Sequence, residues 1–356
     1  MLKDKIRGSL IGGAAGDALG YAIEFLGENE IFKRYGNSGI REYSLDSVSG
    51  KALISDDTQM TLFTTEAIET CHMRVNNLRY QANNSYQNWL ETQQTSYEKS
   101  EYVAFSRANG LIPEGLMHEP EMYSRRAPGS ICLSALEIRK KQLWISGSFI
   151  ENKINNSKGC GSVMRAAPIG FLNCDIRELD MESAEIAAIT HCHSLGYMSA
   201  AILTHVIHGI IYNDNQMTLK EIVEDARDTV AMIFINDEHI DELVNIINDA
   251  SELSENNDSD LDNIHRLGEG WVAEEALAIA LYCSLRYHYD FSECIIKAVN
   301  HKGDSDSTGA IAGNIIGTRI GYNEIDSKWK NNLELEEVIV EFTDELCIAL
   351  GKSQSM

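Results

Sequence analysis

The sequence predicts an all-α protein that folds as a single domain over residues 1–356. Apolar residues recur at helical spacing through most of the chain, and proline occurs at only four positions. No Pro/Gly/Ser-rich stretch reads as a linker between two cores. Hydrophobic residues make up 44% and charged residues 24%, which are ordinary globular values, and a chain of this length can bury a sizeable core.

Five segments carry apolar residues at helical spacing, and we expect each to form a helix: 60–72, 183–212, 219–234, 271–287 and 336–350. Two further segments carry a glycine at every fourth position, which places the glycines on one stripe of a helix. These are Gly8, Gly12, Gly16 and Gly20, and then Gly309, Gly313, Gly317 and Gly321. Each glycine costs a helix about 1 kcal/mol relative to alanine, so the stripes predict close helix packing, with loops as the alternative.

Two other segments break the helical pattern. Residues 113–128 hold three of the four prolines, and we expect an irregular connection long enough to be functional. Residues 236–262 are acidic and polar, and they predict a partly solvated helix followed by a mobile loop.

The charge of the chain restricts its partners. The formal net charge of −24 repels phosphate backbones and anionic lipid, so we expect neither nucleic acid nor a membrane as partner. The eight cysteines form no CxxC pair, which favours free thiols in a reducing compartment. No secretory leader is recognisable, and no apolar run reaches the roughly eighteen residues that span a bilayer. We therefore expect a cytoplasmic protein.

Two short segments concentrate oxygen ligands: Ser55-Asp56-Asp57-Thr58 and Asp304-Ser305-Asp306-Ser307-Thr308. Each precedes a predicted helix, so helix capping explains either one alone, and Asp56 with Gln59 has capping-box spacing. Adjacent carboxylates also repel each other unless a cation or proton intervenes, and hard cations such as Mg²⁺, Mn²⁺ or Ca²⁺ suit this donor set.

A calcium-binding EF-hand can be rejected for the second segment. Its first, third, fifth and sixth positions match, but the twelfth is Ile315 and not the required glutamate. Any further metal ligands must then come from far away in the sequence, most directly from Asp56 and Asp57. Glu24, about two helical turns beyond Asp17, is an ordinary solvated side chain on spacing alone.

The run Gly159–Arg165 contains two glycines, which suit either a tight turn or a backbone cradle for an anion. It matches neither a dinucleotide-binding nor a Walker A pattern. His191-Cys192-His193 is a poor zinc chelate because i and i+2 do not face the same way on a helix. Cys160 has no base nearby in sequence to make it a nucleophile.

Together, seven segments of the chain resemble the ADP-ribosylglycohydrolase family, which includes the dinitrogenase-reductase-activating glycohydrolases. They are GSLIGGAAGDALGYAIEF (8–25), SDDTQM (55–60), RRAPGSICLSAL (125–136), GCGSVMRAAPIG (159–170), HCHSLGY (191–197), GWVAEEALAIALY (270–282) and HKGDSDSTGAIAGNIIG (301–317). The resemblance spans nearly the whole chain. It implies a compact all-α ADP-ribosylglycohydrolase-like domain with a central site for two divalent cations, Mg²⁺ or alternatively Mn²⁺.

The resemblance also implies roles for individual residues. The metal ligands would be Ser55, Asp56, Asp57, Asp304, Asp306 and Ser307. Glu24, Asp57 and Asp306 would be catalytic. The substrate-binding residues would be Gly129, Ser130, Gly159, Cys160, Gly161, Ser162, Met164 and His193. Ser55 and Ser307 stand where many relatives carry threonine, and both keep the hydroxyl.

The implied activity is metal-dependent hydrolysis of the N-glycosidic bond that joins mono-ADP-ribose to a protein side chain, with arginine as the expected linkage. Hydrolysis of a small ADP-ribose derivative is a related alternative. A different class is an immunity-type protein that occludes an ADP-ribosylating toxin through aromatic residues of 91–128, namely Tyr97, Tyr102, Phe105 and Tyr123. A metal-free helical scaffold would leave both acidic segments as caps.

Overall fold

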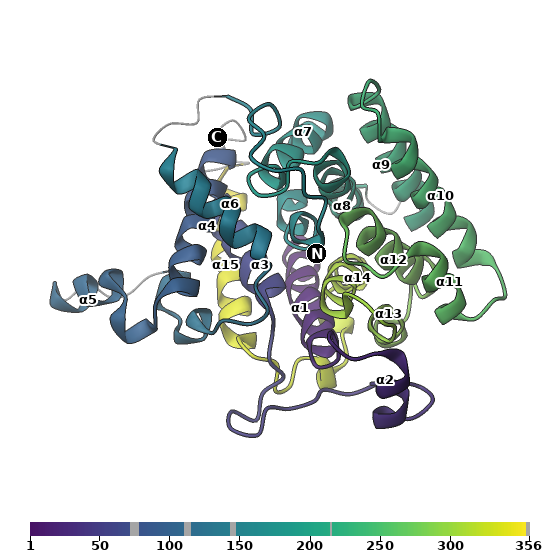
Figure 1. Cartoon of the computed structure of the whole chain (residues 1–356), viewed down its shortest axis with the longest axis horizontal. Coiled ribbons are helices and arrows are strands. Elements are labelled where there is room, and N and C mark those ends of the chain that lie inside the picture. The colour runs from purple at the N-terminus through teal and green to yellow at the C-terminus, as the bar shows by residue number, and fades with distance from the viewer. Residues whose placement is uncertain (72–77, 110–114, 143–146, 214–215, 354–356) are drawn as a thin grey trace.

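At the centre of the fold, two glycine-striped helices from opposite ends of the chain lie against each other. They are α1 (Leu2–Tyr21) and α14 (Ser305–Ile320), drawn in purple and yellow-green in Figure 1. The structure is a computed structural model that describes residues 1–71, 78–109, 115–142, 147–213 and 216–353. Within these residues the chain is helical and contains no strand, so the all-α prediction is confirmed.

The glycine stripes pair residue by residue in antiparallel order. A Cβ atom placed on Gly16 would lie 1.9 Å from the carbonyl oxygen of Gly309, and one on Gly12 would lie 2.3 Å from that of Gly313. Gly8 meets Gly317 in the same way, at 2.2 Å. Real Cβ atoms do not approach that closely, so only glycine permits this contact. The glycine spacing therefore predicted both the helices and their close packing.

Two positions differ from the predicted stripe. Gly321 lies just beyond α14 with φ +84°, so it ends the helix in a conformation that favours glycine. The partner of Gly20 is instead Ser305, whose carbonyl oxygen would lie 2.2 Å from a Cβ on Gly20. This last pair brings the end of α1 to the start of α14.

The other helices surround this pair, with α3, α4, α6 and α15 on one side and α9 to α12 on the other (Figure 1). The N-terminal half contains α2 (Glu28–Tyr35), α3 (Asp56–Thr70), α4 (Leu78–Gln94), α5 (Glu101–Ala108), α6 (Ser130–Lys141) and α7 (Ile176–Ala187). The C-terminal half adds α8 (Ser194–Tyr212), α9 (Leu219–Ile233), α10 (Ile240–Glu255), α11 (Asp260–Leu267), α12 (Ala273–Arg286), α13 (Phe291–Val299) and α15 (Glu336–Ser353).

The long apolar segment 183–212 is two helices and not one. Helix α7 ends at Ala187, and α8 begins at Ser194 after a turn that contains His191. The side chains of the turn remain mostly buried, so apolar spacing continues across the break and hides it in the sequence. Helix α8 is long and apolar enough to cross a membrane by length and composition, contrary to the expectation from the sequence. It is a core helix here, because 89% of its most apolar stretch is buried within the fold.

The two segments that break the helical pattern also take defined forms. The acidic region 236–262 contains α10, and α11 begins within it, so it is more helical than predicted. The proline-containing region is irregular as expected, with short 3₁₀ turns at Leu116–His118 and Pro120–Tyr123. Residues 110–114 of that region lie outside the described residues. Next to it, α5 projects from the body and exposes Tyr102 and Phe105 (Figure 1).

We expect Gly16→Ala to lower the free energy of unfolding by about 2–3 kcal/mol, because its methyl group would collide with the Gly309 backbone. Urea denaturation with far-UV circular dichroism measures this. The control is Gly351→Ala, at a helical glycine with open space around it, which should change stability by less than about 1 kcal/mol. Equal effects of the two substitutions would contradict the close α1–α14 contact.

Candidate functional site

Five carboxylates from three helix ends converge on one cavity of about 300 Å³. Glu24 lies in the turn just after α1, and Asp56 and Asp57 begin α3. Asp304 and Asp306 lie at the start of α14. The two acidic segments are distant in sequence, and the packing of α1 on α14 helps bring them together.

These carboxylates are buried and lack cationic partners. All five are at most 7% exposed, and within the described part of the chain none forms an ion pair with Lys, Arg or His. One oxygen of Glu24 and one of Asp57 are buried without any hydrogen-bond partner. Oxygen atoms of Glu24, Asp304 and Asp306 lie within 4.8 Å of one another. Buried charges need compensation, so this donor set fits hard divalent cations.

The electrostatic cost appears in the pKa values. Burial, and then the charges of Asp306, Asp304 and Asp56, raise the pKa of Glu24 to about 10. Burial and the Asp306 charge raise the pKa of Asp56 and Asp57 well above the usual range of a carboxyl group. The same two causes act on Asp304. Without added positive charge these groups cannot all ionise together.

Capping does not account for the acidic segments. The N-cap of α3 is Ser55, whose hydroxyl oxygen accepts a hydrogen bond from the Asp57 N–H at 3.2 Å. The capping-box interpretation of Asp56 is therefore wrong, and Gln59 instead accepts from Trp89 and Gln93. Asp304 is the N-cap residue of α14 but makes no capping hydrogen bond. The hydroxyl of Ser55 does not line the cavity, and its role as a metal ligand stays a prediction.

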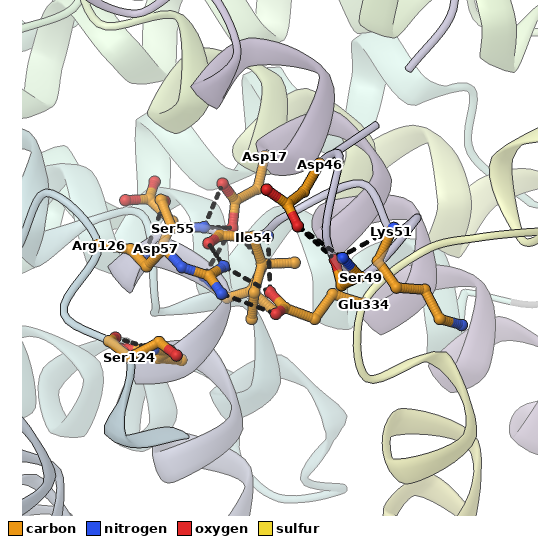
Figure 2. Close-up of polar contacts among 12 residues, drawn as sticks. Asp17, Asp46, Ser49, Lys51, Ile54, Ser55, Asp57, Ser124, Arg126 and Glu334 are labelled. Carbon is orange, nitrogen blue, oxygen red and sulfur yellow. Dashed lines mark hydrogen bonds and ion pairs between the residues drawn. The ribbon is translucent and has the colours of Figure 1, made fainter. Parts of the chain in front are cut away.

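Asp17, which the sequence analysis left without a role, braces the start of α3. Its fully buried carboxylate accepts a hydrogen bond from the Ser55 N–H at 3.0 Å (Figure 2). It also accepts from the Thr58 N–H at 3.1 Å and from the Thr58 hydroxyl. Burial and the Asp306 charge raise the pKa of Asp17 to about 7, while the hydrogen bonds from Thr58 and Ser55 oppose this rise. The sequence did contain a signal for this role, because Asp17 is a charged residue within the glycine- and alanine-rich segment of α1.

A second contact holds the same segment from the other side. Arg126 forms a bidentate ion pair with Glu334, with N–O distances of 2.6 and 2.8 Å (Figure 2). Glu334 also accepts from the Ile54 N–H, and Arg126 donates to the Ile54 carbonyl. The backbone that leads into Asp56 is thereby fixed by Asp17 on one side and by this ion pair on the other.

The lining of the same cavity also includes backbone N–H donors. Gly129 and Ser130 lie at the start of α6, and the Gly129 N–H donates to the Asp56 carboxylate at 3.4 Å. No side chain among the described residues caps α6, so the N–H groups of its first turn can donate to a ligand. The lining continues with Gly159, Cys160, Gly161 and Met164, and among described residues the Gly161 N–H donates to none. A helix N-terminus beside a glycine loop is suited to an anion.

Two predicted substrate-binding residues lie elsewhere. The Ser162 side chain is buried off the cavity, with its hydroxyl within hydrogen-bond distance of the Gly159 and Gly196 carbonyls. His193 is the N-cap of α8, accepts from the Leu195 N–H and packs on His239. His193 does not line the cavity, and its role in substrate binding stays a prediction. His191 lines the cavity instead, because it precedes the helix and lies in the turn after α7.

Other lining residues had no clear signal in the sequence, and they are Phe25, Ala127, Ile131, Cys132 and Trp271. Trp271 is 43% exposed at the rim. An isolated antiparallel bridge between Gly159 and Val272 holds it there, and the Cys160 N–H donates to the Trp271 carbonyl at 3.2 Å. Cys160 lines the cavity, but burial and the charges of Asp304 and Asp57 raise its pKa well above the usual range, which disfavours a nucleophilic thiolate.

The fold and the cavity define a helical protein with a buried acidic cluster beside backbone N–H donors of a glycine loop and a helix start. The sequence profile of the ADP-ribosylglycohydrolase family matches residues 1–355, and the chain belongs to this family. It is thus an ADP-ribosylglycohydrolase enzyme, as its resemblance implied.

Relatives support this assignment. An uncharacterized protein of Archaeoglobus fulgidus is 27% identical and covers 97% of this chain and 96% of its own. Human ADP-ribosylhydrolase ARH3 is 23% identical over 50% of this chain and 54% of its own. ADP-ribosyl-[dinitrogen reductase] glycohydrolase of Rhodospirillum rubrum is 38% identical over 15% of this chain and 19% of its own. A solved ADP-ribosylglycohydrolase-related protein complex shares the fold, with a TM-score of 0.65 and 19% identity over 98% of this chain and 99% of that one.

We expect Asp17→Asn to lower the free energy of unfolding by about 2 kcal/mol, because an amide cannot accept all the hydrogen bonds that start α3. Chemical denaturation measures this. Asp46→Asn is a matched control, since Asp46 also accepts from two backbone N–H groups but in an exposed turn, and it should cost under about 1 kcal/mol. An effect of Asp17→Asn no larger than that of Asp46→Asn would argue against the brace.

Proposed function

We propose that this enzyme removes mono-ADP-ribose from a protein side chain, with arginine as the preferred linkage, and that it requires two divalent cations. The observation that carries the proposal is the convergence of five buried carboxylates, with no cationic partner among the described residues, on a cavity that also presents backbone donors. The family's use of divalent metals supports the metal requirement.

The residues that would hold the cations are Asp56, Asp57, Asp304, Asp306 and Ser307 of the cavity lining, together with Ser55, which accepts from the Asp57 N–H. At such a set, divalent cations supply neutralisation of charge, orientation of the substrate and acidification of a bound water. Mg²⁺ and Mn²⁺ both suit carboxylate and hydroxyl oxygens.

The remaining groups bind and orient the substrate. The backbone N–H groups of the Gly159–Met164 loop and of the start of α6 would donate to the two phosphates of ADP-ribose. The face of Trp271 at the rim offers a surface on which the adenine ring of ADP-ribose can stack. Held in this way, the distal ribose would lie against the acidic wall.

Glu24 is the group best placed to take a proton from the attacking water. It lies in the turn after α1, and one of its oxygens has no partner in the structure. Burial and three neighbouring carboxylates raise its pKa, so its proton affinity depends on how far the surrounding charge is neutralised. Cleavage of the glycosidic bond builds positive charge on the anomeric carbon, as in other glycoside hydrolysis.

The arginine linkage is supported by charge. A net charge of −24 and an acidic cavity favour a cationic guanidinium over a neutral leaving group. A small ADP-ribose derivative would occupy the same cavity. A toxin partner and a cytoplasmic location remain hypotheses, and the eight unpaired cysteines support a reducing compartment.

We expect the purified chain to release ADP-ribose from an arginine-modified protein with Mg²⁺ or Mn²⁺, and to lose that activity in excess EDTA. Chromatography of the released ADP-ribose measures the rate. Serine-modified protein and small ADP-ribose conjugates run in parallel identify the linkage. Release that is unaffected by EDTA would contradict the metal requirement. Faster release from one of the other substrates would show that arginine is not the preferred linkage.

We expect Asp57→Asn and Asp306→Asn to reduce turnover at least about a hundredfold, because each removes a cation-holding oxygen. Neither should lower the melting temperature without metal, since each removes a buried charge that its neighbours repel. The rise in melting temperature on adding Mg²⁺ should disappear in both variants.

The matched control is Asp228→Asn, at an exposed carboxylate paired with Arg227. It should keep both turnover and the Mg²⁺-dependent rise in melting temperature. If Asp57→Asn and Asp306→Asn behave like this control, the acidic cluster is not the metal site.

A further inference from the structure

His191 lines the cavity at the glycine loop, and its hydrogen-bond partners indicate which of its ring nitrogens carries the proton. A Cβ atom placed on Gly159 would lie 3.2 Å from Nε2 of His191, and one on Gly161 would lie 3.0 Å from Cε1. The other nitrogen, Nδ1, lies 2.9 Å from the hydroxyl oxygen of Thr190. A neutral histidine has one N–H, so its tautomer decides whether Nε2 donates or accepts.

Arg165 sets the direction of this hydrogen bond. Arg165 is 1% exposed, and its guanidinium carbon lies 4.4 Å from the centre of the Tyr86 ring. Among the described residues its Nη1 contacts the sulfur atoms of Met60 and Cys132, and it forms no ion pair with a carboxylate. Its Nη2 donates to the Thr190 hydroxyl at 2.6 Å. A guanidinium has five donors and no acceptor, so the hydroxyl oxygen of Thr190 must accept.

The single hydroxyl proton of Thr190 then has one destination. Two groups among the described residues lie within hydrogen-bond distance of the Thr190 hydroxyl, the Arg165 guanidinium and Nδ1 of His191. The guanidinium can only donate, so Nδ1 is the group that can accept the hydroxyl proton. If Nδ1 carried the proton instead, both neighbours would donate to Thr190, and its buried hydroxyl proton would have no acceptor. The satisfied arrangement leaves Nδ1 unprotonated and places the proton on Nε2.

We propose that Arg165 and Thr190 are positioning residues that fix His191 as an Nε2–H donor toward an anionic oxygen of the ligand's diphosphate. The ligand identity rests on the proposed function, whereas the tautomer does not. The donor would act beside the Gly161 N–H and the start of α6, so three groups on one wall would present hydrogen to the same anion.

The surroundings of His191 agree with a neutral ring. Burial, and then the positive charge of Arg165, lower the pKa of His191 to about 3. A neutral ring donates only through the nitrogen that carries its proton, so loss of the tautomer would turn a donor into an acceptor facing an anion. Hydrogen bonds to charged groups are among the stronger ones in proteins.

Nitrogen-15 NMR of the full-length chain with labelled histidine tests the tautomer directly, without ligand or metal. We expect His191, identified by the loss of its signals in His191→Gln, to show a protonated Nε2 and an unprotonated Nδ1. In Thr190→Val, which removes the hydroxyl and keeps a β-branched side chain, the signals should shift toward a mixture of tautomers. Thr190→Ser should restore the wild-type pattern.

Binding of free ADP-ribose measured by calorimetry gives the functional readout. Thr190→Val should weaken affinity about tenfold, and Thr190→Ser should bind within about twofold of the wild type. Where turnover is measurable, Thr190→Val should raise KM with little change in kcat. The reason is that His191 would bind the diphosphate, which is remote from the glycosidic bond that breaks. Thr204→Val is the control, since Thr204 is equally buried but its hydroxyl bonds to Ser183 and the Ala166 carbonyl instead of His191.

A wild-type His191 protonated on Nδ1 would overturn the proposal, as would a Thr190→Val variant with unchanged tautomer and affinity. If Thr190→Val fails to fold, the wild-type tautomer and the Thr190→Ser variant still decide. Failure of the proposed function is separable, because a chain that hydrolyses no ADP-ribosylated protein still reports its tautomer and its affinity for free ADP-ribose.

Discussion

The contact between the backbones of α1 and α14 is the constraint on which the rest of the structure depends. Glycine pairs hold the two helices too close for any side chain between them, and the last pair, Gly20 with Ser305, lies beside the acidic cavity. Helix α1 also carries Asp17, which fixes the start of α3. The same helix therefore positions the carboxylates of α3 and those of α14.

This rigidity holds together a group of charges that repel one another. Burial and the neighbouring carboxylates raise the pKa values of Glu24, Asp56, Asp57 and Asp304, and none of the ion pairs among the described residues brings a cationic side chain to them. Tight backbone packing beneath the cavity and the Arg126–Glu334 ion pair beside it resist that repulsion. Interactions outside the acidic cluster thus hold in place carboxylates that would otherwise move apart.

The sequence predicted the features that depend on local spacing. The glycine stripes indicated close helix packing, and the family resemblance identified Glu24 and the four aspartates that line the cavity. Apolar spacing did not reveal the break between α7 and α8, because the side chains of the intervening turn are also buried. The turn between α7 and α8 is as apolar as a helix, so His191 and His193 could not be told apart by pattern. Asp17 was missed because its partners, Ser55 and Thr58, are brought to it only by tertiary packing.

The separation of α1 and α14 along the chain has a consequence for synthesis on the ribosome. The two helices occupy residues 2–21 and 305–320, so α1 emerges first and must wait for nearly the whole chain before it finds its partner. Until then its glycine face has no neighbour, and Asp56 and Asp57 lack their counterparts from α14. A polypeptide that ends before α14 would therefore contain only part of the acidic set and would lack the complete cavity.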